Sequence, residues 1–433
     1  MIGVRLSCDI RACGQIAEKL RFYSTVAQIA QLRGDIASSL GYIGPMNLIS
    51  TTDDLSAACK ALAQHPYVAV DTEFLREQTF WSRLCLIQLA GPSDEFIVDP
   101  MAQGIDLAPF YELMTNAAVE KIFHAGRQDV EIVFVQAGVI PAPLFDTQIA
   151  AMVCGFGDSI SYVNLVKRIT GADLDKSSRF TDWSRRPLSP QQLTYALGDV
   201  THLRDVYHHL KRDLQKSGRT DWLIEEMAEL TTPETYKQVP EDAWQRLKVR
   251  VKSRRSFAVL MELAAWRERL AQSQDVPRAR ILRDEALYDI ANQAPTDTAK
   301  LGELRTLSEG FARSGRAREI IDAVKLGLER DLKTVPPLPK GQAITPEAAA
   351  LVEFLKVLLK SLAAQKGVAP RLIANADELE RIATENAPDI PALKGWRYEV
   401  FGETALRLKR GEIALAIDGG EVVPVPRVRT APN

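Results

Sequence analysis

The acids Asp71 and Glu73 stand two residues apart at the end of an apolar, β-branched run, VAVDTEFLRE, residues 68–77. Side chains at positions i and i+2 of a strand point to the same face, so the two carboxylates must project together. Neighbouring carboxylates repel, and burial raises their pKa values, unless a multivalent cation lies between them. The pair therefore indicates a metal site, with two solvated acids beyond a strand end as the alternative.

A third acid, Asp129, lies in the segment FHAGRQDVEIVF, which begins as a strand and breaks at Gly126. Asp129 falls in the first turn of the helix predicted to follow, where the helix dipole favours an acid with or without a ligand. His124 is interpreted as a packed strand-end histidine, because no other histidine stands at metal-ligand spacing to it.

A tyrosine and a fourth acid lie in LSPQQLTYALGDVTHLRDVYHHL, residues 188–210, which predicts a long helix. Ser189 would be its N-cap and Pro190 its first helical residue. Tyr195 and Asp199 are four residues apart, so they share a helical face and can reach one site together. A core tyrosine beside an exposed aspartate is the alternative for this pair taken alone.

Short β-rich runs bounded by turn residues position these acids, and helical patterns follow them. The predicted strands are 67–74, 83–91, 95–100 and 120–125. The first three come in quick succession, which favours antiparallel neighbours, and helices separate the later ones. The pattern predicts one mixed α/β domain over residues 46–215.

Helical periodicity takes over after a predicted linker at 216–240, where Pro233 and Pro240 mark the change. The segments 276–291 and 368–383 lie 92 residues apart and resemble each other, which indicates two copies of one helical module. We therefore expect helical domains at 241–332 and 346–425, joined by a proline-rich linker at 333–345. Residues 1–45 form an extension of uncertain role, with a transit-like presequence or a working start at Met46 as alternatives.

The composition is that of a soluble globular protein, with 46% hydrophobic and 25% charged residues and no run long enough to span a membrane. The five cysteines are scattered without a CxxC pair, which favours a reducing cytoplasm over a disulfide framework or a zinc site. The net charge is −2, but residues 244–330 contain 18 basic and 12 acidic residues. This local excess of +6 could meet phosphates.

In order and setting, the motifs DTEF, HAGRQD and YALGD resemble those of the DEDD exonuclease superfamily. The tyrosine four residues before the last acid matches the tyrosine subclass, and Thr194 stands where the other subclass has histidine. The run FTDWSRRPLSPQQLTYALGDVTHL is similar to the ribonuclease D family, and the helical repeats resemble its helicase-and-RNase-D C-terminal (HRDC) domains. The resemblance implies a ribonuclease-H-like mixed-sheet exonuclease domain followed by two all-α, HRDC-like domains.

The same resemblance implies a metal-dependent 3′-to-5′ exoribonuclease that trims tRNA precursors and other small structured RNAs to release nucleoside 5′-monophosphates. The residues that it assigns to two divalent cations, Mg²⁺ or Mn²⁺, are Asp71, Glu73, Asp129 and Asp199. Tyr195 would orient the attacking water. A monomer without membrane attachment is expected. The alternatives are a 3′-to-5′ DNA exonuclease and an inactive RNA-binding protein.

Five further residues are candidates for holding the substrate. Phe74 could stack a terminal base, although packing in the core is as good an account of it. Arg185 and Arg186 precede Pro187 in a loop that leads to the third motif and could contact phosphates. Arg254 and Arg255 close the basic run RLKVRVKSRR, which could bind an RNA backbone or simply be a solvated helix face.

Overall fold

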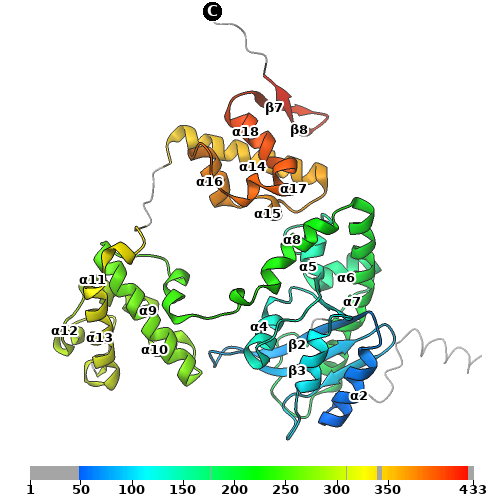
Figure 1. Ribbon diagram of the computed structural model, residues 1–433, viewed down its shortest axis with the longest axis horizontal. Helices are drawn as coiled ribbons and strands as arrows, with labels where there is room; N and C mark the ends of the chain where they lie inside the picture. Colours follow the sequence, from blue (N-terminus) through cyan, green and yellow to red (C-terminus); the bar gives the residue numbers. More distant parts are fainter. Residues whose placement is uncertain (1–47, 176, 309, 339–343, 428–433) are drawn as a thin grey trace, which may run out of the picture. The chain divides into compact units, whose positions relative to one another are not determined.

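The computed structural model describes residues 48–175, 177–308, 310–338 and 344–427 (Figure 1). The predicted extension at 1–45 lies outside these residues, as does part of the predicted linker at 333–345. Within the described part of the chain, every helix is too short or too polar to cross a bilayer.

A six-stranded mixed sheet forms the first domain, with strand order β1-β4-β3-β2-β5-β6. The strands are β1 (Leu48–Ile49), β2 (Tyr67–Leu75), β3 (Arg83–Ala90), β4 (Glu95–Val98), β5 (Glu120–Phe123) and β6 (Leu144–Asp146). β2, β3 and β4 pair antiparallel, whereas β2–β5, β5–β6 and β1–β4 pair parallel. The four predicted strands and their antiparallel start are confirmed. β1 and β6 were not predicted, because two or three residues are too few to show a period.

Helices cover both faces of the sheet, since alternate residues of its strands point to opposite sides. One face packs against α2 (Thr52–Leu62), α3 (Ala108–Thr115) and α4 (Arg127–Ala137). The other packs against α5 (Thr147–Val153), α6 (Tyr162–Thr170), α7 (Pro190–Ser217) and α8 (Thr220–Thr231). Along β2, Val68 and Val70 join the first core, whereas Tyr67 and Ala69 join the second. Asp71 and Glu73 continue the row of Tyr67 and Ala69 and so point toward the side of α7.

The long helix α7 begins as the sequence predicts. The hydroxyl of Ser189 accepts a hydrogen bond from the backbone of Gln192, whose side chain bonds back to Ser189 in a capping box. Pro190 takes the first helical position, where its missing N–H costs nothing. The helix then runs for 28 residues along the sheet and carries Tyr195 and Asp199.

The segment 216–240, expected to be a linker, instead contains α8. Leu223, Met227 and Leu230 are buried in the same core as α7. Their spacing of three and four residues places them on one face of a helix, which explains why this stretch folds onto the sheet domain.

Two copies of one helical arrangement follow (Figure 1). The first copy contains α9 (Arg254–Gln274), α10 (Arg278–Ile281) and α11 (Asp284–Gln293), and continues with α12 (Thr298–Gly302) and α13 (Gly315–Glu329). The second contains α14 (Pro346–Lys366), α15 (Pro370–Ile373) and α16 (Ala376–Thr384). Each of these three helices begins 92 residues after its counterpart in the first copy, so the predicted repeat is confirmed.

The second copy differs from an all-α domain at its end. After α17 (Gly395–Arg397), a π-helical turn at Tyr398–Gly402 and α18 (Glu403–Lys409), the strands β7 (Ile413–Asp418) and β8 (Glu421–Pro426) form an antiparallel hairpin. Gly419 and Gly420 make the turn, and both have positive φ. This addition to the predicted helical fold follows a recognisable signal, a Gly-Gly pair between two β-rich runs.

Candidate active site

Three carboxylates from two distant segments meet on one face of the sheet, toward the C-terminal end of β2. Oxygens of Asp71, Glu73 and Asp199 lie within 4.8 Å of one another. Asp71 and Glu73 come from β2, just before a register shift between Glu73 and Phe74, after which the pairing with β3 resumes one residue out of step. Asp199 comes from α7, which packs against that face of the sheet.

Asp129 joins the same cavity from the first turn of α4. The cavity has a volume of about 470 Å³, and Asp71, Glu73, Asp129, Tyr195 and Asp199 all line it. Asp129 is 7% exposed, and its carboxylate accepts a short hydrogen bond from the hydroxyl of Thr72, the residue between the two acids of β2. Asp129 is not within the 4.8 Å group of three. Its contact with Thr72 nevertheless fixes α4 against β2.

Burial raises the pKa values of all four acids, and repulsion by neighbouring acids of the site adds to the rise for Asp71 and Glu73. Burial, together with the charges of Asp199, Asp129 and Glu73, raises the pKa of Asp71 well above its ordinary value. Burial and the charges of Asp199 and Asp129 raise the pKa of Glu73 to about 9. Burial raises the pKa of Asp199 to about 7, although a hydrogen bond with Tyr195 opposes the rise. Burial also raises the pKa of Asp129 to about 6, against the hydrogen bond from Thr72. Such a group of acids is most stable when a cation shares it.

The residues fit a hard divalent cation. Every ligand atom in the group of three is a carboxylate oxygen, which suits Mg²⁺ or Mn²⁺ rather than zinc. His124 also lines the cavity, but its Nδ1 lies 3.0 Å from the hydroxyl of Thr147, and burial lowers the pKa of the ring. This placement agrees with a packed histidine.

Among the residues that the structure describes, Arg179 is the only arginine or lysine that lines the cavity, and the sequence did not single it out. Its positive charge lowers the pKa values of Glu73, Asp199 and Tyr195, opposing the effect of their burial. Arg179 lies between α6 and α7, in a turn at residues 177–180. The only sequence signal was its place just before FTDWSRRP, within the region of family resemblance.

The five predicted substrate-binding residues lie in different surroundings. Phe74 lines the cavity and also packs against the core beneath it. Arg185 is 84% exposed in its side chain and pairs with Asp182 at 3.3 Å. Arg186 donates to both carboxylate oxygens of Asp99 at 2.7 Å and to the carbonyl oxygen of Cys85.

Arg254 and Arg255 do not line the cavity. Arg254 donates to the carbonyl oxygen of Val335, and Arg255 donates to that of Arg330 at 2.7 Å. Both therefore hold the chain that follows α13 against the start of α9. The helix begins only at Arg254, so residues 246–253 precede it and do not form the solvated helix face considered for the basic run.

Comparison with known proteins assigns the chain to a family. Residues 46–215 match the family model described as 3′-5′ exonuclease, and residues 256–324 match that of the HRDC domain. Ribonuclease D of Nitrobacter hamburgensis is 54% identical over 382 residues, which cover 88% of this chain and all of the relative. The chain belongs to the ribonuclease D family of 3′-5′ exoribonucleases. Ribonuclease D of Bartonella henselae is 49% identical, with 88% of this chain and 94% of the relative covered.

A solved ribonuclease D has the same fold over most of its length. The crystal structure of Escherichia coli RNase D, described as an exoribonuclease involved in structured RNA processing, superposes with a TM-score of 0.72. The two proteins are 27% identical, and the match covers 84% of this chain and 99% of the other. The ribonuclease D architecture, a mixed-sheet exonuclease domain followed by a helical region with an HRDC domain, is therefore confirmed for this chain.

Proposed function

We propose that this member of the ribonuclease D family trims the 3′ ends of tRNA precursors and other small structured RNAs, releasing nucleoside 5′-monophosphates. The observation that carries the proposal is the convergence of four acids and Tyr195 on one cavity in a chain of this family. Support for a structured substrate comes from the description of the Escherichia coli relative, which processes structured RNA.

Asp71, Glu73, Asp129 and Asp199 would together hold two divalent cations, Mg²⁺ or Mn²⁺. When bound, such cations activate water as a nucleophile and stabilise the charge on the leaving 3′ oxygen. The acids themselves must lose their protons before they can act as ligands. Arg179 assists that ionisation, because a positive charge beside a carboxyl group favours its charged form.

Tyr195 would position the attacking water rather than remove its proton. Burial and the nearby acids raise the pKa of its phenol above the ordinary value of about 10, so the hydroxyl keeps its proton at neutral pH. A neutral phenol can donate one hydrogen bond and accept others. It hydrogen-bonds to Asp199 one helical turn away, which aims it into the cavity.

The test is a timed digestion of a 3′-labelled tRNA precursor with Mg²⁺, with Mn²⁺ and with chelator. We expect release of labelled 5′-monophosphate with either cation and none with chelator. Asp71→Asn and Asp199→Asn should each lower kcat at least about 100-fold, because a lost metal ligand removes several kcal/mol of transition-state stabilisation. Tyr195→Phe should lower kcat while leaving KM for the RNA near its original value.

Asp322→Asn, which alters an exposed acid of α13, is the matched control and should retain full activity. Undiminished digestion by Asp71→Asn would refute the assignment of the site. Digestion of a DNA oligomer as fast as RNA of the same sequence would instead refute the substrate. The proposal also places the enzyme in the cytoplasm as a monomer, and the unpaired Cys59, Cys85 and Cys154 suit that reducing compartment.

A further inference from the structure

We propose that a second pocket, next to the catalytic cavity, binds backbone phosphates of the same RNA strand upstream of the nucleotide being removed. The inference rests on the proposed function, because it assumes that an RNA 3′ end enters the catalytic cavity. The pocket, called the arginine pocket below, has a volume of about 350 Å³. Its basic lining residues are Arg76, Arg127, Arg246 and Arg278.

The arginine pocket adjoins the catalytic cavity. Gln128 lines both, and it is the residue before Asp129 on α4. Arg76 follows β2 by one residue, and β2 carries Asp71 and Glu73. In an RNA strand whose last phosphodiester lies among the acids, the next phosphates upstream would therefore lie beside Gln128 and reach the arginines.

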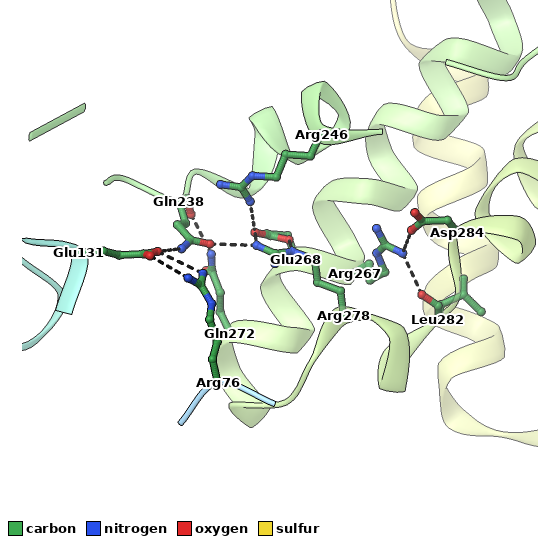
Figure 2. Close-up of polar contacts among 10 residues, drawn as sticks. All are labelled: Arg76, Glu131, Gln238, Arg246, Arg267, Glu268, Gln272, Arg278, Leu282 and Asp284. Carbon is green, nitrogen blue, oxygen red and sulfur yellow. Dashed lines mark hydrogen bonds and ion pairs between the residues drawn. The ribbon is translucent and has the colours of Figure 1, made fainter. Parts of the chain in front are cut away.

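Two carboxylates, the buried Glu268 and the half-buried Glu131, hold three of the four arginines in fixed positions (Figure 2). Glu268 of α9 is 1% exposed and accepts hydrogen bonds from Arg246 at 2.8 Å and from Arg278 at 2.5 and 2.6 Å. Glu131 of α4 accepts from Arg76 at 3.1 Å. A guanidinium has five N–H donors in a rigid plane, so one bound to a carboxylate through one edge can still donate to a phosphate.

Gln238 joins the two walls of the pocket (Figure 2). Its amide nitrogen donates to Glu131 at 2.6 Å, and its amide oxygen accepts from Arg278 at 2.9 Å. Its backbone oxygen accepts from Gln272 of α9 at 2.8 Å. The sheet domain thus supplies Arg76 and Arg127 to the pocket, and the first helical module supplies Arg278, which Glu268 of α9 holds in place.

The charges are arranged so that the positive groups face outward. The side chains of Arg127 and Arg246 are 56% and 49% exposed, whereas those of Glu131 and Glu268 are 18% and 1% exposed. Arg127 also pairs at 2.9 Å with Glu229, but that carboxylate is 73% exposed, and such a pair contributes little and can yield to a phosphate. A basic pocket beside an acidic one suits a polyanion whose end is held by metal ions.

The experiment compares an RNA dinucleotide with a single-stranded RNA oligomer, each digested with Mg²⁺ at several salt concentrations. In the double variant Arg127→Gln/Arg246→Gln, we expect KM for the oligomer to rise about tenfold. The slope of log(kcat/KM) against log[salt] should become shallower by about 1.4, because two phosphate contacts are lost. KM and kcat for the dinucleotide should stay within about twofold, since it is too short to span both pockets. Arg269→Gln is the matched control, because Arg269 is 51% exposed and pairs with Glu241, outside the pocket.

Oligomer kinetics equal to those of Arg269→Gln would overturn the inference, as would an equal rise in KM for oligomer and dinucleotide. Failure of the unsubstituted enzyme to digest either RNA would instead refute the proposed function. If the double variant unfolds early, Arg127→Gln alone serves, because its partner Glu229 is exposed and loses little. That single variant should still raise KM for the oligomer several-fold, with a slope weaker by about 0.7, and unchanged values would overturn the inference equally.

Discussion

At the scale of single residues, the acids and Tyr195 lie where local geometry predicts. Asp71 and Glu73 are two residues apart on β2 and so share one face of the strand. Tyr195 and Asp199 are four residues apart on α7 and share one face of the helix, and both pairs line the cavity. The roles of these residues remain predictions until tested. Arg186 illustrates the limit of such reasoning, because only the fold brings Asp99 within 2.7 Å of it.

Arg179 is the residue whose substitution should be most informative beyond the acids. We expect Arg179→Ala to lower kcat/KM for RNA about 10- to 100-fold, because a cation lining a phosphodiesterase cavity stabilises negative charge in the transition state. The variant should also need more Mg²⁺ for half-maximal activity, since Glu73 and Asp199 would ionise less readily. Steady-state kinetics at several Mg²⁺ concentrations measure both effects. Arg318→Ala, on the surface of α13, is the control, and an Arg179 variant indistinguishable from it would exclude this role.

At the scale of helices and strands, the 92-residue repeat was readable because both copies keep the same helix boundaries. The helix α8 and the β7–β8 hairpin were missed for different reasons. α8 lies between two predicted domains, where prolines at 233 and 240 drew attention to a break. The hairpin follows a helical region, and its local signal conflicts with the surrounding pattern.

Close packing of α9 against α13 depends on a glycine. A Cβ atom built on Gly327 would lie 2.4 Å from the Cα atom of Val259, so backbone would have to move. We expect Gly327→Ala to lower the free energy of unfolding of the first helical module by about 1–3 kcal/mol, which is the usual effect of overpacking. Urea denaturation of the full chain with a probe in this module, such as the fluorescence of Trp266, measures the change.

Gly315→Ala on the same helix is the matched control for that measurement. In the part of the chain that the structure describes, no atom lies within 4 Å of a Cβ built there, outside its chain neighbours and the helix backbone. Replacing a helical glycine with alanine should leave stability unchanged or raise it by up to about 1 kcal/mol. Equal stability of the two variants would mean that α9 and α13 do not pack this closely.

At the scale of the whole molecule, three distant segments of chain bring acids together, and the free energy of unfolding should record the repulsion. The pKa of Glu73 is raised to about 9 from an ordinary 4.5, so the folded protein binds this proton more tightly than the unfolded chain between those values. The metal-free protein should therefore lose stability as pH rises through that window. Asp129 and Asp199, with pKa values of about 6 and about 7, add to the loss in its lower part.

Mg²⁺ should reverse this loss, and its effect should grow with pH because the ligands must release protons to bind it. Thermal unfolding of the protein with excess Mg²⁺ and with chelator, at pH values from about 6 to about 9, measures the difference in Tm. Glu73→Gln should flatten the pH dependence of the metal-free protein. A Tm difference independent of pH in the unsubstituted protein would contradict the coupled acidic site.

The sequence by itself determined most of the longer elements and which of their side chains share a face, because strand and helix periods act over a few residues. It thereby indicated the acidic site, the long capped helix and the repeated module. Only the tertiary structure decided which charged side chains from distant parts of the sequence come into contact. It placed Arg179 in the cavity, tied Arg186 to Asp99, and gathered four arginines around Gln238. Arg186 and Asp99 are 87 positions apart, and Gln238 and its partner Glu131 are 107 apart, separations over which no local period carries information.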